Sequence, residues 1–240
     1  MNFTGDTKVK DIALSHPAAR RVLESAGLDY CCGGAKSLRD ACLHSETSPD
    51  EILRRLHEAP CESVTEYETW LDAPLGDLTR HIVERHHAYV RESIPRTQAL
   101  LDKVSDKHGA NHPELQTVRR AFSAVAAEMI AHMQKEERIL FPYIEALQAS
   151  VVSGRPVEHP FFGTVKNPIQ AMMKDHDASS EHLKHIRVLT GNYTAPPSAC
   201  TSFKALYQAL LEFESDLHHH IHLETNLLFP RAVELEAAFA

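Results

Sequence analysis

From Leu75 onward, apolar residues recur three and four positions apart in long stretches that are separated by clusters of proline and glycine. This spacing is typical of one face of an α-helix, and alternating β-branched runs are few. The pattern predicts four long helices, over residues 75–105, 113–148, 166–192 and 198–236. Four long helices joined by moderate loops favour an up-down-up-down four-helix bundle.

The first sixty residues carry shorter helical patterns. One helix is predicted in HPAARRVLESAGL and ends near Gly27, and another begins at Ser48 as N-cap with Pro49 in its first turn. The stretch CESVTEYETWLDAP has mixed polarity and is typical of a linker. We therefore expect an all-α protein with a small helical domain over residues 1–65 and the bundle over residues 66–240.

A repeated motif, H-x3-E-x3-L-F-P, occurs in the second and fourth predicted helices. It reads HMQKEERILFP from His132 and HIHLETNLLFP from His220. The first and third helices each offer a histidine at a matching distance, His87 and His176. The bundle is thus predicted to consist of two copies of a two-helix unit. His86 is adjacent to His87, but the repeat spacing and the flanking apolar residues favour His87.

Helical geometry gives these residues a direction. Positions four apart are separated by about 40° around an α-helix, so Glu136 shares a face with His132 and Glu224 shares one with His220. Both pairs fall within the apolar stripes that face the core. Three other histidines of the fourth helix point away on this geometry and are expected on or near the surface: His218, His219 and His222.

Six polar side chains are therefore aimed at one level of an apolar interior, where unpaired carboxylates would be costly. They are His87, His132, Glu136, His176, His220 and Glu224. Neutral imidazoles and carboxylates are metal ligands, and six of them, two able to bridge, exceed what one tetrahedral zinc ion uses. A site for two ions is predicted. The ligand types suit iron, and leave zinc or manganese open.

Composition excludes several functions. The formal net charge is −8 and no basic stripe is present, which argues against a nucleic-acid partner. No signal-peptide pattern and no run of about 18 apolar residues occur, so we expect a cytoplasmic protein without a membrane partner.

The cysteines show no repeated spacing, which fits reduced thiols. They are Cys31, Cys32, Cys42, Cys61 and Cys200, and the last three match no motif.

The chain resembles the hemerythrin-like family, and more closely the iron-sulfur cluster repair di-iron proteins, known as RIC proteins. The resemblance covers nearly the whole chain and rests on YCCGG at residues 30–34, on the two H-x3-E-x3-L-F-P motifs and on D-H-D around His176. It implies a hemerythrin-like bundle that holds two non-haem irons beside an oxo or hydroxo group. The implied terminal ligands are His87, His132, His176 and His220, and the implied bridging ligands are Glu136 and Glu224.

The same resemblance implies a role for two further carboxylates. Asp175 precedes the third ligand and Glu128 lies one turn before the second, so both are expected beside the ligands or on a path for iron exit. Hydrogen-bonded or solvated acids remain the alternative. Asp216 occupies the position equivalent to Glu128 in the repeat. Val90 replaces a further histidine of some relatives, so no fifth histidine ligand is expected from that helix.

The YCCGG loop carries two adjacent cysteines. A bond between Cys31 and Cys32 would close a strained ring, so we expect them to act on partners elsewhere. Gly33 and Gly34 give the backbone the freedom to approach a metal or another protein. The resemblance connects this module with repair. Two structural thiols are the alternative interpretation.

The resemblance implies a stress protein that repairs iron-sulfur clusters damaged by nitric oxide or peroxide, by supplying iron. Its partners would be damaged iron-sulfur proteins or the cluster-assembly machinery, and a homodimer remains open. One alternative is a module that binds nitric oxide or dioxygen at the same site for scavenging or sensing. Another is an enzyme that reduces nitric oxide there. A conventional enzyme is not expected.

Overall fold

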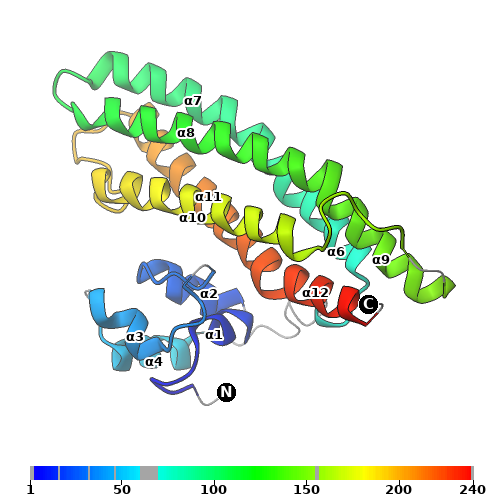
Figure 1. Ribbon diagram of the computed structural model, residues 1–240. Coiled ribbons are helices and arrows are strands. Elements are labelled where there is room, and N and C mark those ends of the chain that lie inside the picture. The colour runs from blue at the N-terminus through cyan, green and yellow to red at the C-terminus, as the bar shows by residue number, and fades with distance from the viewer. Residues whose placement is uncertain are drawn as a thin grey trace.

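A computed structural model describes the chain over residues 3–15, 17–31, 33–45, 47–59, 70–154 and 157–238. Long helices packed as a bundle follow a small N-terminal helical region (Figure 1), which confirms the expected all-α fold class. The predicted domain boundary at residues 65–66 lies outside the described residues. None of the helices in the described ranges combines the length and the apolar content needed to cross a membrane.

The N-terminal region contains short helices around a core of its own. They are α1 (Val9–Ser15), α2 (Pro17–Ser25), α3 (Leu38–Ala41), the 3-10 turn η1 (Cys42–His44) and α4 (Pro49–Glu58). As predicted, the Ser48 side chain accepts a hydrogen bond from the Glu51 backbone N–H and caps α4. Gly27 follows α2 with a φ of 66°, the left-handed conformation that favours glycine. Ile12, Leu23 and other apolar residues are buried between these helices.

The bundle has four helical rods, three of which contain a π-helical segment. The first is α6 (Leu75–His81), η2 (Ile82–His87) and α7 (Ala88–His108), and the second is α8 (Glu114–Lys135), η3 (Glu136–Leu140) and α9 (Phe141–Ser153). The third is α10 (Lys166–Leu189), and the fourth is α11 (Thr201–Leu223), η4 (Glu224–Leu228) and α12 (Phe229–Ala237). The third rod ends earlier than predicted because Gly191, Asn192 and Tyr193 adopt left-handed φ angles of 54°, 56° and 58°.

Two apolar clusters fill the bundle. One joins α7, α8, α10 and α11 and includes Phe122 and Phe213, and the other lies around α6, α9 and α12 and includes Leu78 and Leu228. Along every rod, the residues predicted as metal ligands lie where these two clusters meet. The polar level is therefore enclosed by apolar packing above and below it.

The N-terminal helices lie against the side of the bundle formed by α10 and α11 (Figure 1). The Tyr30 ring lies 5.3 Å from the ring of His222 and 6.2 Å from that of His218. Ser215 Oγ donates to Glu24 Oε2 at 3.3 Å. The N-terminal region thus covers one face of the fourth rod.

This contact corrects a sequence-based expectation. His222 was expected on or near the surface and is fully buried, whereas His218 and His219 are half-buried and stay near the surface as expected. The prediction treated the fourth rod as part of an isolated bundle, in which that face is a surface. It was wrong because residues from the N-terminal region pack over that face.

Candidate metal centre

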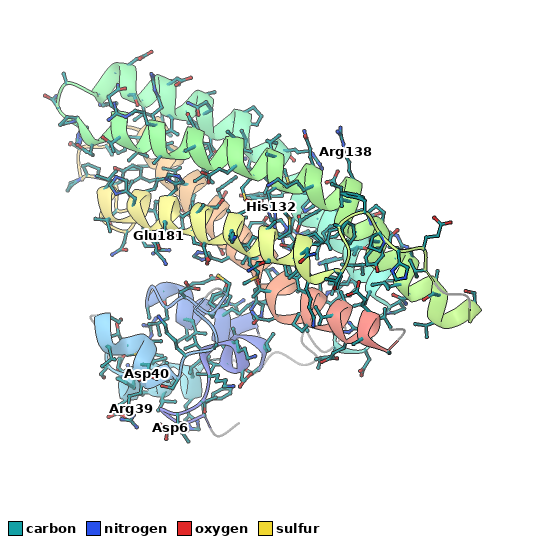
Figure 2. All side chains as sticks on the ribbon, viewed as in Figure 1. Asp6, Arg39, Asp40, His132, Arg138 and Glu181 are labelled. Atoms are coloured by element: carbon teal, nitrogen blue, oxygen red, sulfur yellow. The ribbon has the colours of Figure 1, made fainter. Side chains whose placement is uncertain are left out.

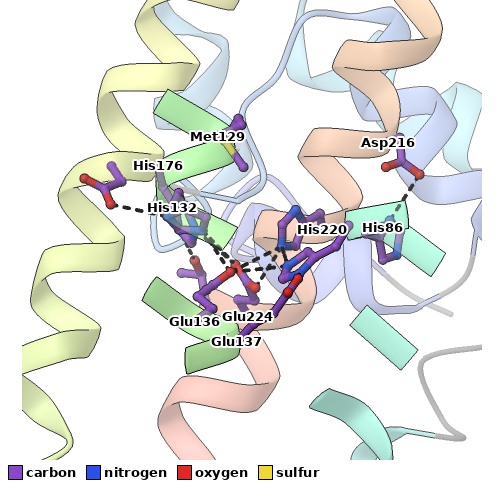
Figure 3. Close-up of polar contacts among 12 residues, drawn as sticks. His86, Met129, His132, Glu136, Glu137, His176, Asp216, His220 and Glu224 are labelled. Atoms are coloured by element: carbon purple, nitrogen blue, oxygen red, sulfur yellow. Dashed lines mark hydrogen bonds and ion pairs between the residues drawn. The ribbon is translucent and has the colours of Figure 1, made fainter. Parts of the chain in front are cut away.

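The six predicted ligands meet at the polar level of the bundle, and each has an exposed fraction of 0%. They are His87, His132, Glu136, His176, His220 and Glu224. Figure 2 shows His132 inside the bundle, whereas Arg138, from the next turn of the same rod, points outward. In Figure 3 His132 and His176 lie on one side and His220 on the other, with Glu136 and Glu224 between them.

The six side chains form two groups that share both glutamates. One group is His87, Glu136, His220 and Glu224, and the other is His132, Glu136, His176 and Glu224. Within each group, one potential ligand atom from every residue lies within 4.8 Å of the others. Two four-ligand sites with common carboxylates are the arrangement expected for two neighbouring metal ions.

Each glutamate reaches one histidine of each group. Glu136 Oε2 lies 3.3 Å from His87 Nε2 and 3.2 Å from His132 Nε2. Glu224 Oε1 lies 2.8 Å from His220 Nε2, and its Oε2 lies 3.0 Å from His176 Nε2. The two carboxylates therefore have the placement that bridging ligands require.

Local backbone structure follows from the L-F-P part of the motif. Pro142 and Pro230 have no backbone N–H, so neither can donate to the carbonyl four residues earlier. In both rods a π-helical segment precedes the proline and begins at the shared glutamate, Glu136 or Glu224. Single π turns inside α-helices often occur at functional sites. The repeat thus places both glutamates at the same point of a widened turn.

Electrostatics keep the carboxylate of Glu224 ionised. Burial alone would raise the pKa of Glu224, but His220, His132 and His176 hold it well below its usual range. Burial alone would lower the pKa of His132, but Glu136 and Asp175 raise it well above its usual range. Negative charge in the centre is thus stabilised by imidazoles.

The donor set fits two cations. Within the described part of the chain, no hydrogen-bond donor meets either oxygen of Glu136 in regular geometry. Buried carboxylate oxygens without donors, facing imidazole nitrogens, are met by metal ions. The set contains nitrogen and oxygen and no thiolate, which suits a first-row metal such as iron, manganese or zinc.

Two ligand histidines are supported by carboxylates through Nδ1. His132 Nδ1 lies 3.4 Å from Asp175 Oδ2, which also accepts from Lys135 Nζ at 2.7 Å. The bond from His132 and the Lys135 ammonium lower the pKa of Asp175 to about 2. Asp175 thus lies beside a ligand, as the resemblance implied. Such contacts orient metal-binding imidazoles and fix their tautomer.

The second supporting carboxylate, Glu137, was not predicted. His87 Nδ1 lies 2.6 Å from Glu137 Oε1, which also accepts from Arg91. In the other half of the repeat, Thr225 Oγ1 lies 3.5 Å from His176 Nδ1. Glu137 and Thr225 each directly follow a shared glutamate. Comparison of these equivalent positions in the two copies of the repeat could have identified them.

Glu128, a predicted neighbour of the ligands, lies away from them, and His86, the alternative to His87, is not part of either four-ligand group. Glu128 contacts Ser179 and His182, each at 3.4 Å, and is half-exposed on the surface of the bundle. His86 is buried with Nδ1 3.1 Å from Asp216 Oδ1, and belongs to neither metal-capable group. The structure thus places His87, and not its neighbour, at the centre.

The predicted thiol loop is partly described. Cys31 is 3% exposed, packs against the bundle core, and has its Sγ 3.3 Å from Asp29 Oδ1. Cys32 and Cys61 lie outside the described residues. Cys200 is the N-cap residue of α11, where the backbone N–H groups of Phe203 and Ser202 lower the pKa of its thiol.

Comparison with known proteins agrees with this geometry. Residues 78–232 match the family model described as hemerythrin HHE cation binding domain. Residues 5–60 match ScdA_N, described as a domain of unknown function. The chain is 35% identical over 231 residues to the iron-sulfur cluster repair protein YtfE of Escherichia coli O81 (strain ED1a), covering 95% of this chain and 97% of the relative. YtfE of Escherichia fergusonii matches with the same identity and coverage.

The two family matches together span both regions of the chain, and the hemerythrin match contains all six buried ligands. The YtfE relatives align with the chain over nearly their whole length. The resemblance drawn from the motifs is confirmed. The chain belongs to the hemerythrin HHE cation-binding family and, over nearly its full length, to the family of the iron-sulfur cluster repair protein YtfE.

Proposed function

We propose that this protein repairs iron-sulfur clusters damaged by nitrosative or oxidative stress, and that it does so by supplying iron from a non-haem di-iron centre. The observation that carries the proposal is the pair of buried four-ligand groups that share Glu136 and Glu224. The relatives that match the chain from end to end bear the name iron-sulfur cluster repair protein. Damaged iron-sulfur proteins, or the machinery that assembles their clusters, are the proposed recipients.

The choice of iron rests on the donor set. Four imidazoles and two carboxylates without a thiolate suit iron, and the hemerythrin match describes a cation-binding domain. When bound, two irons would supply redox chemistry and ligand positions that small molecules such as nitric oxide can occupy. His87 and His220 would hold one iron, and His132 and His176 the other.

Charge supports release as well as binding. The imidazoles are neutral when they bind metal, so the shared glutamates contribute two negative charges against four positive charges on two ferrous ions. The nearest further carboxylates, Glu137 and Asp175, are engaged by Arg91 and Lys135. A buried centre that retains positive charge is less stable than a neutral one, which favours giving up an ion.

The test uses the full chain loaded with isotopically labelled iron and an enzyme whose iron-sulfur cluster has been nitrosylated. We expect enzyme activity to recover and the label to appear in the rebuilt cluster. The double variant Glu136→Gln/Glu224→Gln should bind no iron pair and restore nothing. His182→Ala removes a half-exposed histidine of α10 and is the matched control that should act as the parent does.

Other outcomes would replace the proposal. Capture of nitric oxide in proportion to protein, without label transfer, would assign the centre to binding, scavenging or sensing. Continued consumption of nitric oxide with a reductant would indicate an enzyme. Equal recovery with the metal-free chain would remove the role of the metal centre altogether.

A further inference from the structure

The internal repeat relates two pairs of residues beside the metal centre. Asp175 directly precedes His176, and His86 directly precedes the repeat-related His87. Glu128 lies one turn before His132, and Asp216 lies one turn before His220. His86 and Asp216 are therefore the counterparts of Asp175 and Glu128, on the opposite side of the bundle.

This second pair, His86 and Asp216, is in contact with the metal centre through the ligand His220. The His86 ring is parallel to that of the ligand His220 within 9°, with ring centroids 5.8 Å apart. His86 Nδ1 lies 3.1 Å from Asp216 Oδ1, and Figure 3 shows His86 between His220 and Asp216. His86 is 1% exposed and the Asp216 side chain 10%. A series of polar side chains, His220, His86 and Asp216, thus leads outward from the metal centre.

Three polar atoms of this series have no hydrogen-bond partner among the described residues: His220 Nδ1, His86 Nε2 and Asp216 Oδ2. The other three ligand histidines all have a partner at Nδ1. Buried polar atoms left unmet cost free energy, and are ordinarily satisfied by water or an ion. These three atoms on the side of His220 can therefore bind a water molecule or an ion, whereas Nδ1 of each other ligand histidine already has a protein partner.

Asp216, at the outer end of this series, lines a cavity of about 420 Å³ that lies between α2, the first rod and the fourth rod. Asp216 lines this cavity and also contacts His86, whereas the His219 ring, also in the lining, lies 4.9 Å from the His86 ring. The charged lining residues are Arg20, Arg21, Arg85, Glu24, Glu212 and Asp216. Their formal charges cancel, so the cavity as a whole does not repel a cation.

We propose that Asp216 and His86 form a transit site through which a divalent metal ion passes between this cavity and the position held by His87 and His220. A carboxylate and an imidazole are good ligands for first-row divalent ions. Two protein ligands are fewer than a stable site uses, which suits passage rather than storage. The inference rests on the proposed binding of two metal ions, and does not require cluster repair.

The proposal gives each metal position its own route. Asp175 lies on the side of His132 and His176, and Asp216 lies on the side of His87 and His220. The N-terminal region covers the second route, because its Arg20 and Glu24 line the cavity. A metal ion that leaves the position held by His87 and His220 must therefore pass the N-terminal region before it reaches solvent.

The test measures metal uptake by the metal-free full-length chain, with cobalt(II) in excess and its absorption followed by stopped flow. The variants are His86→Phe, which keeps a ring against His220, and Asp216→Asn. We expect one of the two uptake phases to slow by about tenfold or more, the scale on which groups beyond the direct ligands act. Total cobalt should stay at two per chain. Asp175→Asn should slow the other phase.

Glu212→Gln is the matched control, because it removes a carboxylate of the same cavity that does not contact His86, and it should leave both phases unchanged. Unchanged kinetics in His86→Phe and Asp216→Asn would overturn the proposal. A fall to one cobalt per chain with the remaining phase intact would also overturn it, by showing that the pair only positions His220. If the parent chain takes up cobalt in two phases and these variants slow them as expected, but the iron-loaded parent repairs no clusters, the transit site stands and only the repair function is contradicted.

Discussion

The four clustered histidines of the fourth rod have different surroundings, and their chemistry follows from these surroundings. His220 faces the centre, while His222 is packed beneath Tyr30 and bonded through Nδ1 to Asn226 at 2.9 Å. Burial lowers the pKa of His222 to about 3, so its ring is neutral at physiological pH. The same residue type serves as a metal ligand at one position and as packing material two positions later.

Replacing His222 should therefore change stability and leave the metal in place. His222→Ala removes a fully buried ring that contacts Tyr30, and we expect a loss of about 1–3 kcal/mol in the free energy of unfolding. Metal analysis should still give two ions per chain. His185→Ala, at an exposed position of α10, should change neither quantity. A loss of metal from His222→Ala would show that the assigned ligand face is wrong.

Glu137 provides a second residue-scale prediction. Its carboxylate lies 2.6 Å from His87 Nδ1, so Glu137→Gln weakens the support of a ligand without removing one. We expect metal affinity to fall by about 10- to 100-fold, as found for such supporting groups. Competition with a chelator of known affinity measures the change. Thr225→Val, which removes a longer contact of 3.5 Å, should have a smaller effect; an equal effect would argue against the carboxylate as the cause.

At the scale of elements, three π-helical segments lie at the ligands: η2 ends at His87, η3 begins at Glu136 and η4 begins at Glu224. Two of them precede a proline and the first does not, so proline accounts for only part of the pattern. A π turn places one more residue in a turn than an α-helix and changes which side chains share a face. The ligand geometry thus depends on the turn as well as on the ligand residues.

Pro142→Ala tests this dependence. The substitution restores an N–H that can bond the Arg138 carbonyl, which favours a regular α turn and moves Glu136 relative to the histidines. We expect weaker metal binding, while the metal-free chain becomes more stable by about 1 kcal/mol or stays unchanged. Calorimetric titration and urea unfolding measure the two effects.

Pro95→Ala is the control, because Pro95 lies inside α7, away from the shared glutamates. It should change stability without changing metal affinity. If Pro142→Ala binds metal as the parent does, the π turn at Glu136 is a consequence of the proline and not a requirement of the centre.

The repeat and the helical period were sufficient to predict the rods and the six inward side chains, because both are local properties of the chain. His132 and Glu136 share a face whatever packs around them. The environment of His222 was not predictable in this way, since it depends on Tyr30, which is distant in the sequence. The π turns were also missed, because a proline in a helical pattern signals a disturbance without specifying its form.

At the scale of the whole molecule, the chain gathers four imidazoles and two carboxylates in its interior, and two of the imidazoles bind protons more strongly there than in water. Burial works against protonation of His87 and His132, but the surrounding carboxylates together raise both pKa values: Glu136 with Glu224 and Glu137 at His87, and Glu136 with Asp175 and Glu224 at His132. Burial lowers the pKa of His220. Folding of the metal-free chain is therefore linked to proton binding at this one level of the bundle.

The sign of this linkage differs between the acid and alkaline sides. A histidine with a raised pKa stabilises the fold below the unfolded value of 6.5, and that stability is lost as pH rises through the folded value. The lowered pKa of Glu224 contributes stability above the unfolded value of 4.5, which is lost as pH falls. The lowered pKa of His220 costs stability only below about 6.5, so it does not alter the alkaline side.

Metal replaces the protons on the ligand nitrogens, and the alkaline loss should then disappear. We expect the urea midpoint of the metal-free chain to fall between about pH 6 and about pH 9, and that of the metal-loaded chain to hold steady over the same range. Below about pH 6 the loaded chain should lose its metal, because protons compete for the imidazoles. The His222 ring stays neutral in the folded chain, so the control variant His222→Ala should keep the difference between the two curves. Parallel curves for the loaded and metal-free chains would show that the buried histidines do not hold protons in the absence of metal.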